Sequence, residues 1–371
     1  MGLHERLEPV LTVARESAAR ADADAAFPKA SVTALRDSGL LGLTLSEEVG
    51  GLGAGPHELV ETISALAGAC GSTAMIYLMH VSAAMTVAAA PPPGAPDLLS
   101  RLASGESLAT LAFSERGSRS HFWAPVSRSK RNGAGMVLDA RKSWVTSAGQ
   151  AELYVTSTLN PDADTVDLYA IPADTPGVAV SGDWHGLGLR ANASNPMTFG
   201  VEVPGDHRIG PEGGGFELML QTVMPWFNLG NAAVSVGLCQ AAVDGAVRHT
   251  SAAKLEHLEQ SLSALPTIRA QLAKMSIDLA CTQSYVDRAA DRLAKPAEDT
   301  VLHVLGVKAA ANDAALRITD TAMRVCGGAA FSEHLQIERF FRDARAGSVM
   351  APTADVLYDL YGKAITGQPL F

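Results

Sequence analysis

The sequence is poor in cysteine and has no excess of positive charge. Its four cysteines, Cys70, Cys239, Cys281 and Cys326, lie far apart and form no C-x-x-C pair. We therefore expect neither a disulfide framework nor a zinc site. The 29 Lys and Arg residues are outnumbered by 39 Asp and Glu residues, and the formal net charge is -10. This balance argues against the basic surface of a nucleic-acid-binding protein, so no nucleic-acid partner is expected.

A secretion signal and a long hydrophobic run are also missing. The N-terminus, MGLHERLEPVL, mixes acidic and basic residues and contains no long apolar stretch, which is not typical of a signal peptide. The most apolar segment, residues 74–90, contains His80 and Ser82 and is followed by three prolines. It is too short and too interrupted to predict a membrane span. We expect a cytoplasmic protein.

The common motifs of metal sites and of serine nucleophiles do not occur. No pair among the ten histidines has H-E-x-x-H or H-x-x-x-H spacing, and no G-x-S-x-G is present. The glycine-rich loop at residues 50–55 fits neither of the phosphate-binding patterns, G-x-G-x-x-G and G-x-x-x-x-G-K-[ST], so it is interpreted as a turn. No metal site is expected.

The hydrophobic period changes twice along the chain, which predicts three domains of an α+β fold. Residues 1–107 have helical spacing, with helices over 7–20, from an N-cap at Ser31 to Gly39, and a pair over 58–89 that breaks near Gly71. Residues 108–212 have a period of two, which is typical of a small β-barrel or sandwich. Its predicted strands are 108–114, 136–140, 143–147, 153–159, 166–171, 178–181 and 197–203. Residues 213–371 return to helical spacing.

The last predicted domain, residues 213–371, is an antiparallel four-helix bundle. Its helices are predicted over 216–253, 265–293, 300–326 and 353–366. Six motifs follow one another along the whole chain, and their order and spacing resemble the acyl-CoA dehydrogenase superfamily. They lie at residues 39–55, 111–120, 141–149, 186–190 with 201–204, 326–328 and 338–345. The resemblance implies a flavin-dependent oxidoreductase.

The resemblance also implies an FAD cofactor and the residues that contact it. The backbone N–H and hydroxyl of Ser114, together with Thr146, are suited to stabilise the electron density that oxidised flavin gains, and Trp144 is suited to stack on its ring. The alternative for Trp144 and Thr146 is an ordinary alternating strand. Other positions that the resemblance places at the cofactor are Phe113, Ser120, Arg324, Gly327, Gly328, Thr353 and Asp355. The two glycines also fit a plain helix C-cap.

The sequence departs from the superfamily at the catalytic base. Members of this superfamily use a glutamate at one of two positions, which correspond here to Ala351 and Phe227. Neither residue can accept a proton. Glu47, Glu48 and Glu115 are carboxylates that could replace it, although acidic loop residues are usually solvated. Large apolar residues at the predicted substrate pocket indicate a substrate with substantial hydrophobic bulk. The pocket is predicted to comprise His80, Trp226, Phe227, Asn228, Met350 and Ala351. A packed core histidine is the alternative for His80.

His121 is the predicted catalytic residue, with an ordinary loop histidine as the alternative. Its segment, Ser118 to Trp123, is similar to an element of reduced-flavin monooxygenases built on this fold. Such enzymes need no α-proton base and take reduced FMN or FADH2 from a flavin reductase.

The sequence is therefore compatible with three functions. The first is α,β-dehydrogenation of an acyl thioester on CoA or a carrier protein, with an external electron acceptor. The second is reduced-flavin-dependent monooxygenation. The third is a supporting subunit in a heteromer with a homologous, Glu-containing chain. The resemblance implies a homotetramer or homodimer in the first two cases.

Overall fold

The structure, a computed structural model, describes residues 2–371, and these residues pack as two compact units. The first unit contains the described residues up to Leu59 together with Met75–Gly186 and Arg190–Phe227. The second contains Val60–Ala74, Leu187–Leu189 and Asn228–Phe371. The division into three domains stays a prediction of the sequence.

The N-terminal part consists of helices, as the periodicity predicted. They are α1 (Leu3–Asp24), α2 (Lys29–Asp37), α3 (Pro56–Ala69), α4 (Gly71–Ala89) and α5 (Leu98–Ala103), with 3-10 turns η1 (Leu40–Gly42) and η2 (Glu47–Val49). The predicted break near Gly71 is confirmed. The predicted N-cap at Ser31 is wrong, because α2 begins at Lys29 after Pro28 and buries Ser31 inside the helix. Pro28 fits this place because proline is tolerated at the start of a helix.

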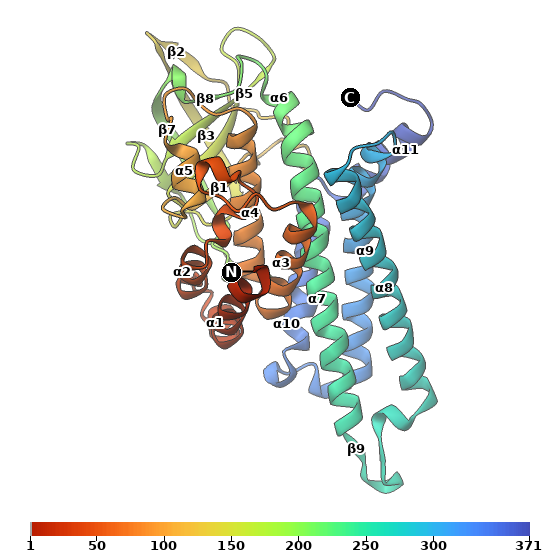
Figure 1. Cartoon of the computed structure of the whole chain (residues 1–371). Helices are drawn as coiled ribbons and strands as arrows, with labels where there is room; N and C mark the ends of the chain where they lie inside the picture. Colours follow the sequence, from red (N-terminus) through yellow and green to blue (C-terminus); the bar gives the residue numbers. More distant parts are fainter. Residues whose placement is uncertain (1) are drawn as a thin grey trace. The chain divides into compact units, whose positions relative to one another are not determined.

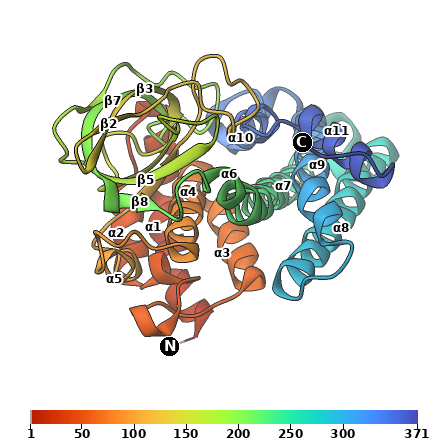
Figure 2. The ribbon, with the colours of Figure 1, turned by 90° about the horizontal axis from the view of Figure 1, so that it is seen from above.

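The first unit also contains two four-stranded sheets (Figure 2). One sheet has the order β1 (Ala109–Ala112), β4 (Leu153–Leu159), β5 (Val166–Pro172) and β8 (Arg208–Ile209). The other has the order β2 (Lys130–Asn132), β3 (Gly135–Val145), β7 (Asn195–Pro204) and β6 (Val178–Val180). The period-two segment is thus a small β unit, as predicted. The short strands β2 and β8 were not predicted.

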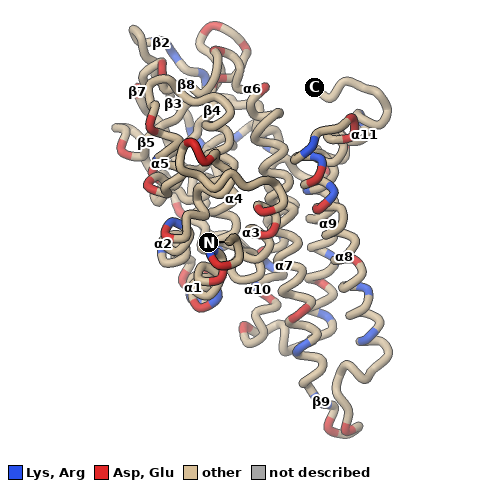
Figure 3. The backbone as a smooth tube through the Cα atoms, viewed as in Figure 1, with Lys and Arg blue, Asp and Glu red and all other residues tan. Residues whose placement is uncertain are grey.

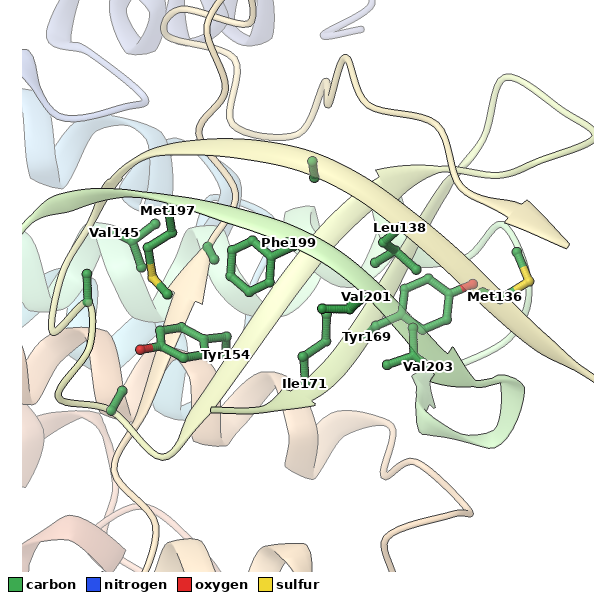
Figure 4. Close-up of a cluster of buried hydrophobic side chains, with 14 residues drawn as sticks. Met136, Leu138, Val145, Tyr154, Tyr169, Ile171, Met197, Phe199, Val201 and Val203 are labelled. Carbon is green, nitrogen blue, oxygen red and sulfur yellow. The ribbon is translucent and has the colours of Figure 1, made fainter. Parts of the chain in front are cut away.

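The side chains between the two sheets make one apolar core (Figure 4). Tyr154 and Phe199, from opposite sheets, meet edge to face with ring centroids 5.7 Å apart. Along β3 the residues Met136, Leu138 and Ala140 are buried, because alternate residues of a strand point to the same face. Two predicted strands, 136–140 and 143–147, belong to this one strand, which a register shift interrupts after Lys142.

The second unit is helical. It contains residues 60–74 of α3 and α4 and, from Asn228 on, α7 (Met224–Ala252). Its other elements are the short hairpin β9 (Lys254–Leu255) and β10 (Gln260–Ser261), α8 (Pro266–Ala294), α9 (Thr300–Cys326), α10 (Ile337–Val349) and α11 (Ala354–Ile365). Helix α9 packs against α8, α10 and α11 (Figure 1). The structure adds α10 to the four predicted helices. It also divides the predicted helix 216–253 into α6 (Gly215–Leu218), a π-helical turn η4 (Met219–Val223) and α7.

Burial explains why α4 is so apolar. By length and composition, α4 is the one helix among residues 2–371 that could cross a membrane, yet 83% of its 18-residue apolar window is buried. This burial is typical of a core helix. Three of the four cysteines are buried, whereas Cys281 is exposed on α8. Charged residues of both signs lie along α8 and α9 (Figure 3).

Candidate functional site

A β-bulge presents Trp144 at the surface of the first unit. The register between β3 and β7 shifts between Lys142 and Val145, and Trp144 adopts a left-handed backbone with φ of 56°. A bulky residue in this conformation is strained. The Trp144 side chain is nevertheless 67% exposed, and its ring meets Trp184 edge to face at 6.0 Å. A strained and exposed large aromatic ring makes Trp144 a candidate for contact with a ligand.

Two polar residues predicted to contact a flavin flank this bulge. Ser114 is half-buried just after β1, and its carbonyl accepts a hydrogen bond of 2.8 Å from the Ser143 N–H, which fixes it beside the bulge. Thr146 is buried, and its hydroxyl lies 3.2 Å from that of Ser194. In the same turn the Ser147 hydroxyl is buried with no hydrogen-bond partner. Three polar residues thus lie at the bulge that exposes the indole ring.

The loop between β1 and β2 holds the other predicted residues of this unit. Phe113 is buried and stacks on Phe122 with ring centroids 6.2 Å apart. Ser120 is half-buried. His121 is exposed and meets Trp123 edge to face at 5.3 Å. The loop therefore leaves the predicted catalytic imidazole open to solvent.

Glu115 is unsuited to act as a base because it is held in a buried ion pair. Its Oε1 lies 2.6 Å from the Lys142 ammonium. Burial acts to raise the pKa of this carboxyl, but Lys142 and the hydrogen bonds from Lys142 and Ser127 outweigh it, so the pKa lies below its usual range. Glu47 and Glu48 are exposed on η2, as expected for solvated loop carboxylates.

His80 belongs to the core of the first unit. It is 0% exposed, its Nδ1 accepts from the Ala109 N–H at 3.0 Å, and its Nε2 lies 3.0 Å from the Leu41 carbonyl. The two contacts fix a neutral tautomer in which Nε2 donates. Of the two roles that the sequence left open, the geometry favours the core histidine over the pocket residue.

We expect His80 to make stability depend on pH. Burial lowers the pKa of His80 to about 4 from its ordinary 6.5. The unfolded chain therefore binds a proton first, and stability falls as pH drops from about 6.5 to about 4. His80→Leu should lower the free energy of unfolding at pH 7 by about 1–3 kcal/mol. The loss of stability between pH 6.5 and pH 4 should become smaller by roughly 2–3 kcal/mol in this variant. Urea unfolding at several pH values measures both.

The exposed His257 provides a matched control. His257→Leu should change the free energy of unfolding at pH 7 by less than about 0.5 kcal/mol, as is usual for surface substitutions. An unaltered profile in His80→Leu would show that His80 does not titrate as described.

In the second unit, Ala351 lies on a segment that Lys308 holds in place. Ala351 is half-buried between α10 and α11. The Lys308 ammonium, buried on α9, donates to the carbonyls of Gly347, Met350 and Pro352 at 2.9, 3.1 and 2.9 Å. Burial lowers the pKa of Lys308 to about 7. Three carbonyl acceptors match the three protons of an ammonium group, so the backbone on both sides of position 351 is fixed.

Three buried asparagines of the second unit, on α7 and α9, keep part of their hydrogen-bonding capacity unused. Asn228 donates to the Val304 carbonyl at 2.9 Å, and Asn312 accepts from Ser235 at 2.8 Å. Asn231 points its amide nitrogen to the Met350 sulfur at 4.0 Å. Each of the three amides keeps one buried atom without a partner. Met350 is half-buried.

The remaining predicted residues lie at element ends. Trp226 is half-buried and Phe227 buried in the first turn of α7. Arg324 is exposed in the last turn of α9, and Gly327 caps this helix with φ of 58°. Gly328 is exposed; Thr353 is the N-cap residue of α11, and Asp355 lies exposed in its first turn.

Lys142, Lys308 and Asn231 were missed by sequence reasoning. A signal existed for two of them. Lys142 continues the inward-facing register of Leu138 and Ala140, and Lys308 interrupts an apolar helix stretch. A charge at an inward position of a strand or helix predicts a buried, paired group. Nothing in the sequence pattern distinguished Asn231. Among residues 2–371 no group of three or more His, Cys, Asp and Glu residues could hold a metal ion.

Comparison with known families matches nearly the whole chain. Three models of the acyl-CoA dehydrogenase family match the chain. The N-terminal domain matches residues 10–106, the middle domain matches residues 110–200, and the C-terminal domain matches residues 213–366. The probable acyl-CoA dehydrogenase FadE25 of Mycobacterium tuberculosis is 27% identical over 359 residues, which cover 94% of this chain and 90% of that protein.

Solved structures with the same fold agree over the full length. Butyryl-CoA dehydrogenase from Megasphaera elsdenii is similar with a TM-score of 0.90 and 21% identity, covering 99% of both chains. The prolyl acyl carrier protein oxidase AnaB is similar with a TM-score of 0.89 and 19% identity, covering 98% of both chains. At these identities the two likenesses establish the fold.

Proposed function

The chain belongs to the acyl-CoA dehydrogenase superfamily, and from this premise we propose that it is an FAD-dependent oxidoreductase that dehydrogenates an acyl thioester between Cα and Cβ. The observation that carries the proposal is the β-bulge at Trp144, which holds an aromatic ring 67% exposed in a strained conformation beside Ser114. Such a ring offers a face for the planar isoalloxazine of the flavin.

The residues at the bulge fit a flavin. Trp144 provides the stacking surface, and Ser114 and the neighbouring turn provide polar groups for the flavin edge. The buried, unpartnered Ser147 hydroxyl marks this turn as a place with spare hydrogen-bonding capacity. We assign Arg324, Gly327, Gly328, Thr353 and Asp355, with Phe113, Ser120 and Thr146, to the rest of the cofactor. When bound, FAD supplies the acceptor for the hydride.

The proton from Cα needs an acceptor other than residues 351 and 227. Ala351 and Phe227 carry no basic group, and Glu115 is held by Lys142. We assign the exposed His121 imidazole to proton transfer, with Trp123 orienting its ring. We assign a pocket for a substrate with hydrophobic bulk to Trp226, Phe227, Asn228 and Met350.

The thioester is proposed to arrive on CoA or on a carrier protein. Among the related proteins, FadE25 is named for acyl-CoA and AnaB for a prolyl carrier protein. We further propose a cytoplasmic homotetramer or homodimer that passes its electrons to a separate acceptor protein.

The missing carboxylates favour a second candidate, a reduced-flavin-dependent monooxygenase. Its chemistry needs no base for an α proton, so the absence of a carboxylate at Ala351 and Phe227 would not impair it. It would take its reduced flavin from a reductase and use His121 near the oxygenated substrate. The third function, a supporting subunit, predicts that a homologous chain with the glutamate co-purifies.

Flavin reduction by thioesters tests the first proposal. Protein loaded with FAD is titrated without oxygen with acyl-CoA thioesters and with the same acyl groups on a carrier protein. We expect at least one thioester to bleach the visible flavin band and to yield the enoyl product. An unchanged band with every thioester, together with an oxygenated product when NADH, a flavin reductase and oxygen are added, would instead support the monooxygenase.

A further inference from the structure

The loop of residues 113–127 carries Ser114, Ser120 and His121 but has little regular structure to fix it. Its internal backbone bonds are short-range turns, such as His121 N–H to the Ser118 carbonyl at 3.0 Å. Arg119 has a left-handed backbone, with φ of 49°. Short turns of this kind do not by themselves define one conformation. Besides the packing of its buried Phe122 and Trp123 side chains, the loop therefore needs polar contacts to hold one conformation.

Glu115 closes this loop on itself. Its Oε2 accepts from the backbone N–H groups of Val126 and Ser127 at 2.8 and 2.7 Å. Its Oε1 accepts from the Ser127 hydroxyl and from the Lys142 ammonium, each at 2.6 Å. One carboxylate thus binds the far end of the loop with three charge-assisted hydrogen bonds and pairs with a lysine from β3.

Lys142 ties the loop to the bulge and to β4. Its ammonium donates to the Ser157 carbonyl at 2.6 Å and contacts the Phe113 carbonyl at 3.4 Å. Glu115 and Lys142 also face each other as an antiparallel bridge. Lys142 is the last residue in regular register before the bulge that presents Trp144. The pair therefore joins the two segments that carry every flavin-edge residue assigned to the first unit.

Packing alone does not explain this pair. Lys142 is 1% exposed and Glu115 7% exposed, and desolvating two charges costs free energy that an apolar pair would not cost. An apolar pair at residues 115 and 142 could not bond to the Phe113 carbonyl, to the N–H groups of Val126 and Ser127, or to β4. The ion pair therefore fixes the conformation of the loop and the bulge, which an apolar pair would not do.

We propose that Glu115 and Lys142 are the positioning residues of the flavin site, which fix the loop of residues 113–127 and the Trp144 bulge in one arrangement before the cofactor binds. The proposal rests on the function proposed above. Preorganisation of this kind strengthens binding because the ordering is complete before the ligand arrives. It acts on the cofactor through Ser114 and Trp144, not by direct contact.

A double variant separates positioning from folding. Lys142→Met leaves an unpaired buried carboxylate and Glu115→Gln an unpaired buried ammonium, so each should lower the melting temperature clearly. The double variant Glu115→Gln/Lys142→Met contains neither charge and should recover most of the lost melting temperature. We expect it still to bind FAD roughly tenfold more weakly than the wild type, and to exchange the amide hydrogens of residues 113–127 faster without FAD.

The exposed pair of Arg131 and Asp162, on the same unit, provides the control. Arg131→Met should change neither FAD affinity nor exchange in the loop. Recovery of both FAD affinity and slow loop exchange in the double variant would overturn the positioning role. Failure of the wild type to bind FAD would overturn the proposed function, and the loop exchange, which needs no flavin, would still report on the pair.

Discussion

Ala351→Glu is expected to raise the rate at which a straight-chain acyl-CoA reduces the bound flavin, by roughly 10²- to 10⁴-fold. A simple acyl thioester has a weakly acidic Cα proton, so its removal needs a positioned base. The resemblance places that base at residue 351, and Lys308 fixes the carbonyls of Met350 and Pro352 on either side of it. Ala351 is half-buried, so a longer side chain at residue 351 does not have to enter a fully packed core. Stopped-flow reduction without oxygen measures the rate.

Ala351→Gln is the matched control, because it adds the same bulk without a proton acceptor. It should leave the rate at the wild-type level. Equal rates for the two variants, with acyl-CoA binding retained, would contradict the assignment of residue 351 to the reacting carbon. A gain for both variants would point to pocket shape instead of proton transfer.

Gly237→Ala is expected to destabilise the second unit by about 3 kcal/mol, as overpacking between two helices does. A Cβ at residue 237 on α7 would lie 2.0 Å from the Ser64 carbonyl oxygen and 2.8 Å from the Ala67 Cβ, both on α3. The first neighbour is backbone and cannot rotate away, so the two helices must move apart. That movement breaks the Ser64 hydroxyl bond to the Ala233 carbonyl at 3.1 Å.

Gly245→Ala, two turns further along α7, should have the opposite sign. Its new Cβ would meet Ile337 at 3.5 Å, an ordinary contact, and alanine stabilises a helix interior by about 1 kcal/mol relative to glycine. Urea unfolding of the two variants measures the difference. Similar effects of both variants would show that α3 and α7 do not approach as closely as described.

Much of the fold was predictable because each domain keeps one hydrophobic period. The strand Leu153–Leu159 and the helix Thr300–Cys326 match their predicted bounds, since turns or glycines bound both. Helix α10 was not predicted, because its residues 338–345 were interpreted only as a motif of the superfamily. The β-bulge was interpreted as a gap between two strands. A register shift leaves only a local irregularity in the alternation, which resembles a turn.

The candidate site was less predictable, because its polar contacts join distant segments. Ser114 and Trp144 were identified from the order of motifs. The ion pair that connects their segments spans 27 residues, and the bonds from Lys308 to the segment at residue 351 span 39 to 44. Local periodicity contains no information on such pairings. The buried state of His80 likewise follows from Leu41 and Ala109, which lie far from it in sequence.

The mass of the product from a single turnover tests the central claim most directly. FAD-loaded protein is mixed without oxygen with a thioester that bleaches its flavin, and the acyl group is analysed by mass spectrometry. Dehydrogenation predicts an acyl group lighter by two hydrogen atoms, formed in an amount equal to the flavin reduced. An unchanged acyl group without oxygen, and one heavier by an oxygen atom once reduced flavin and oxygen are supplied, would contradict it.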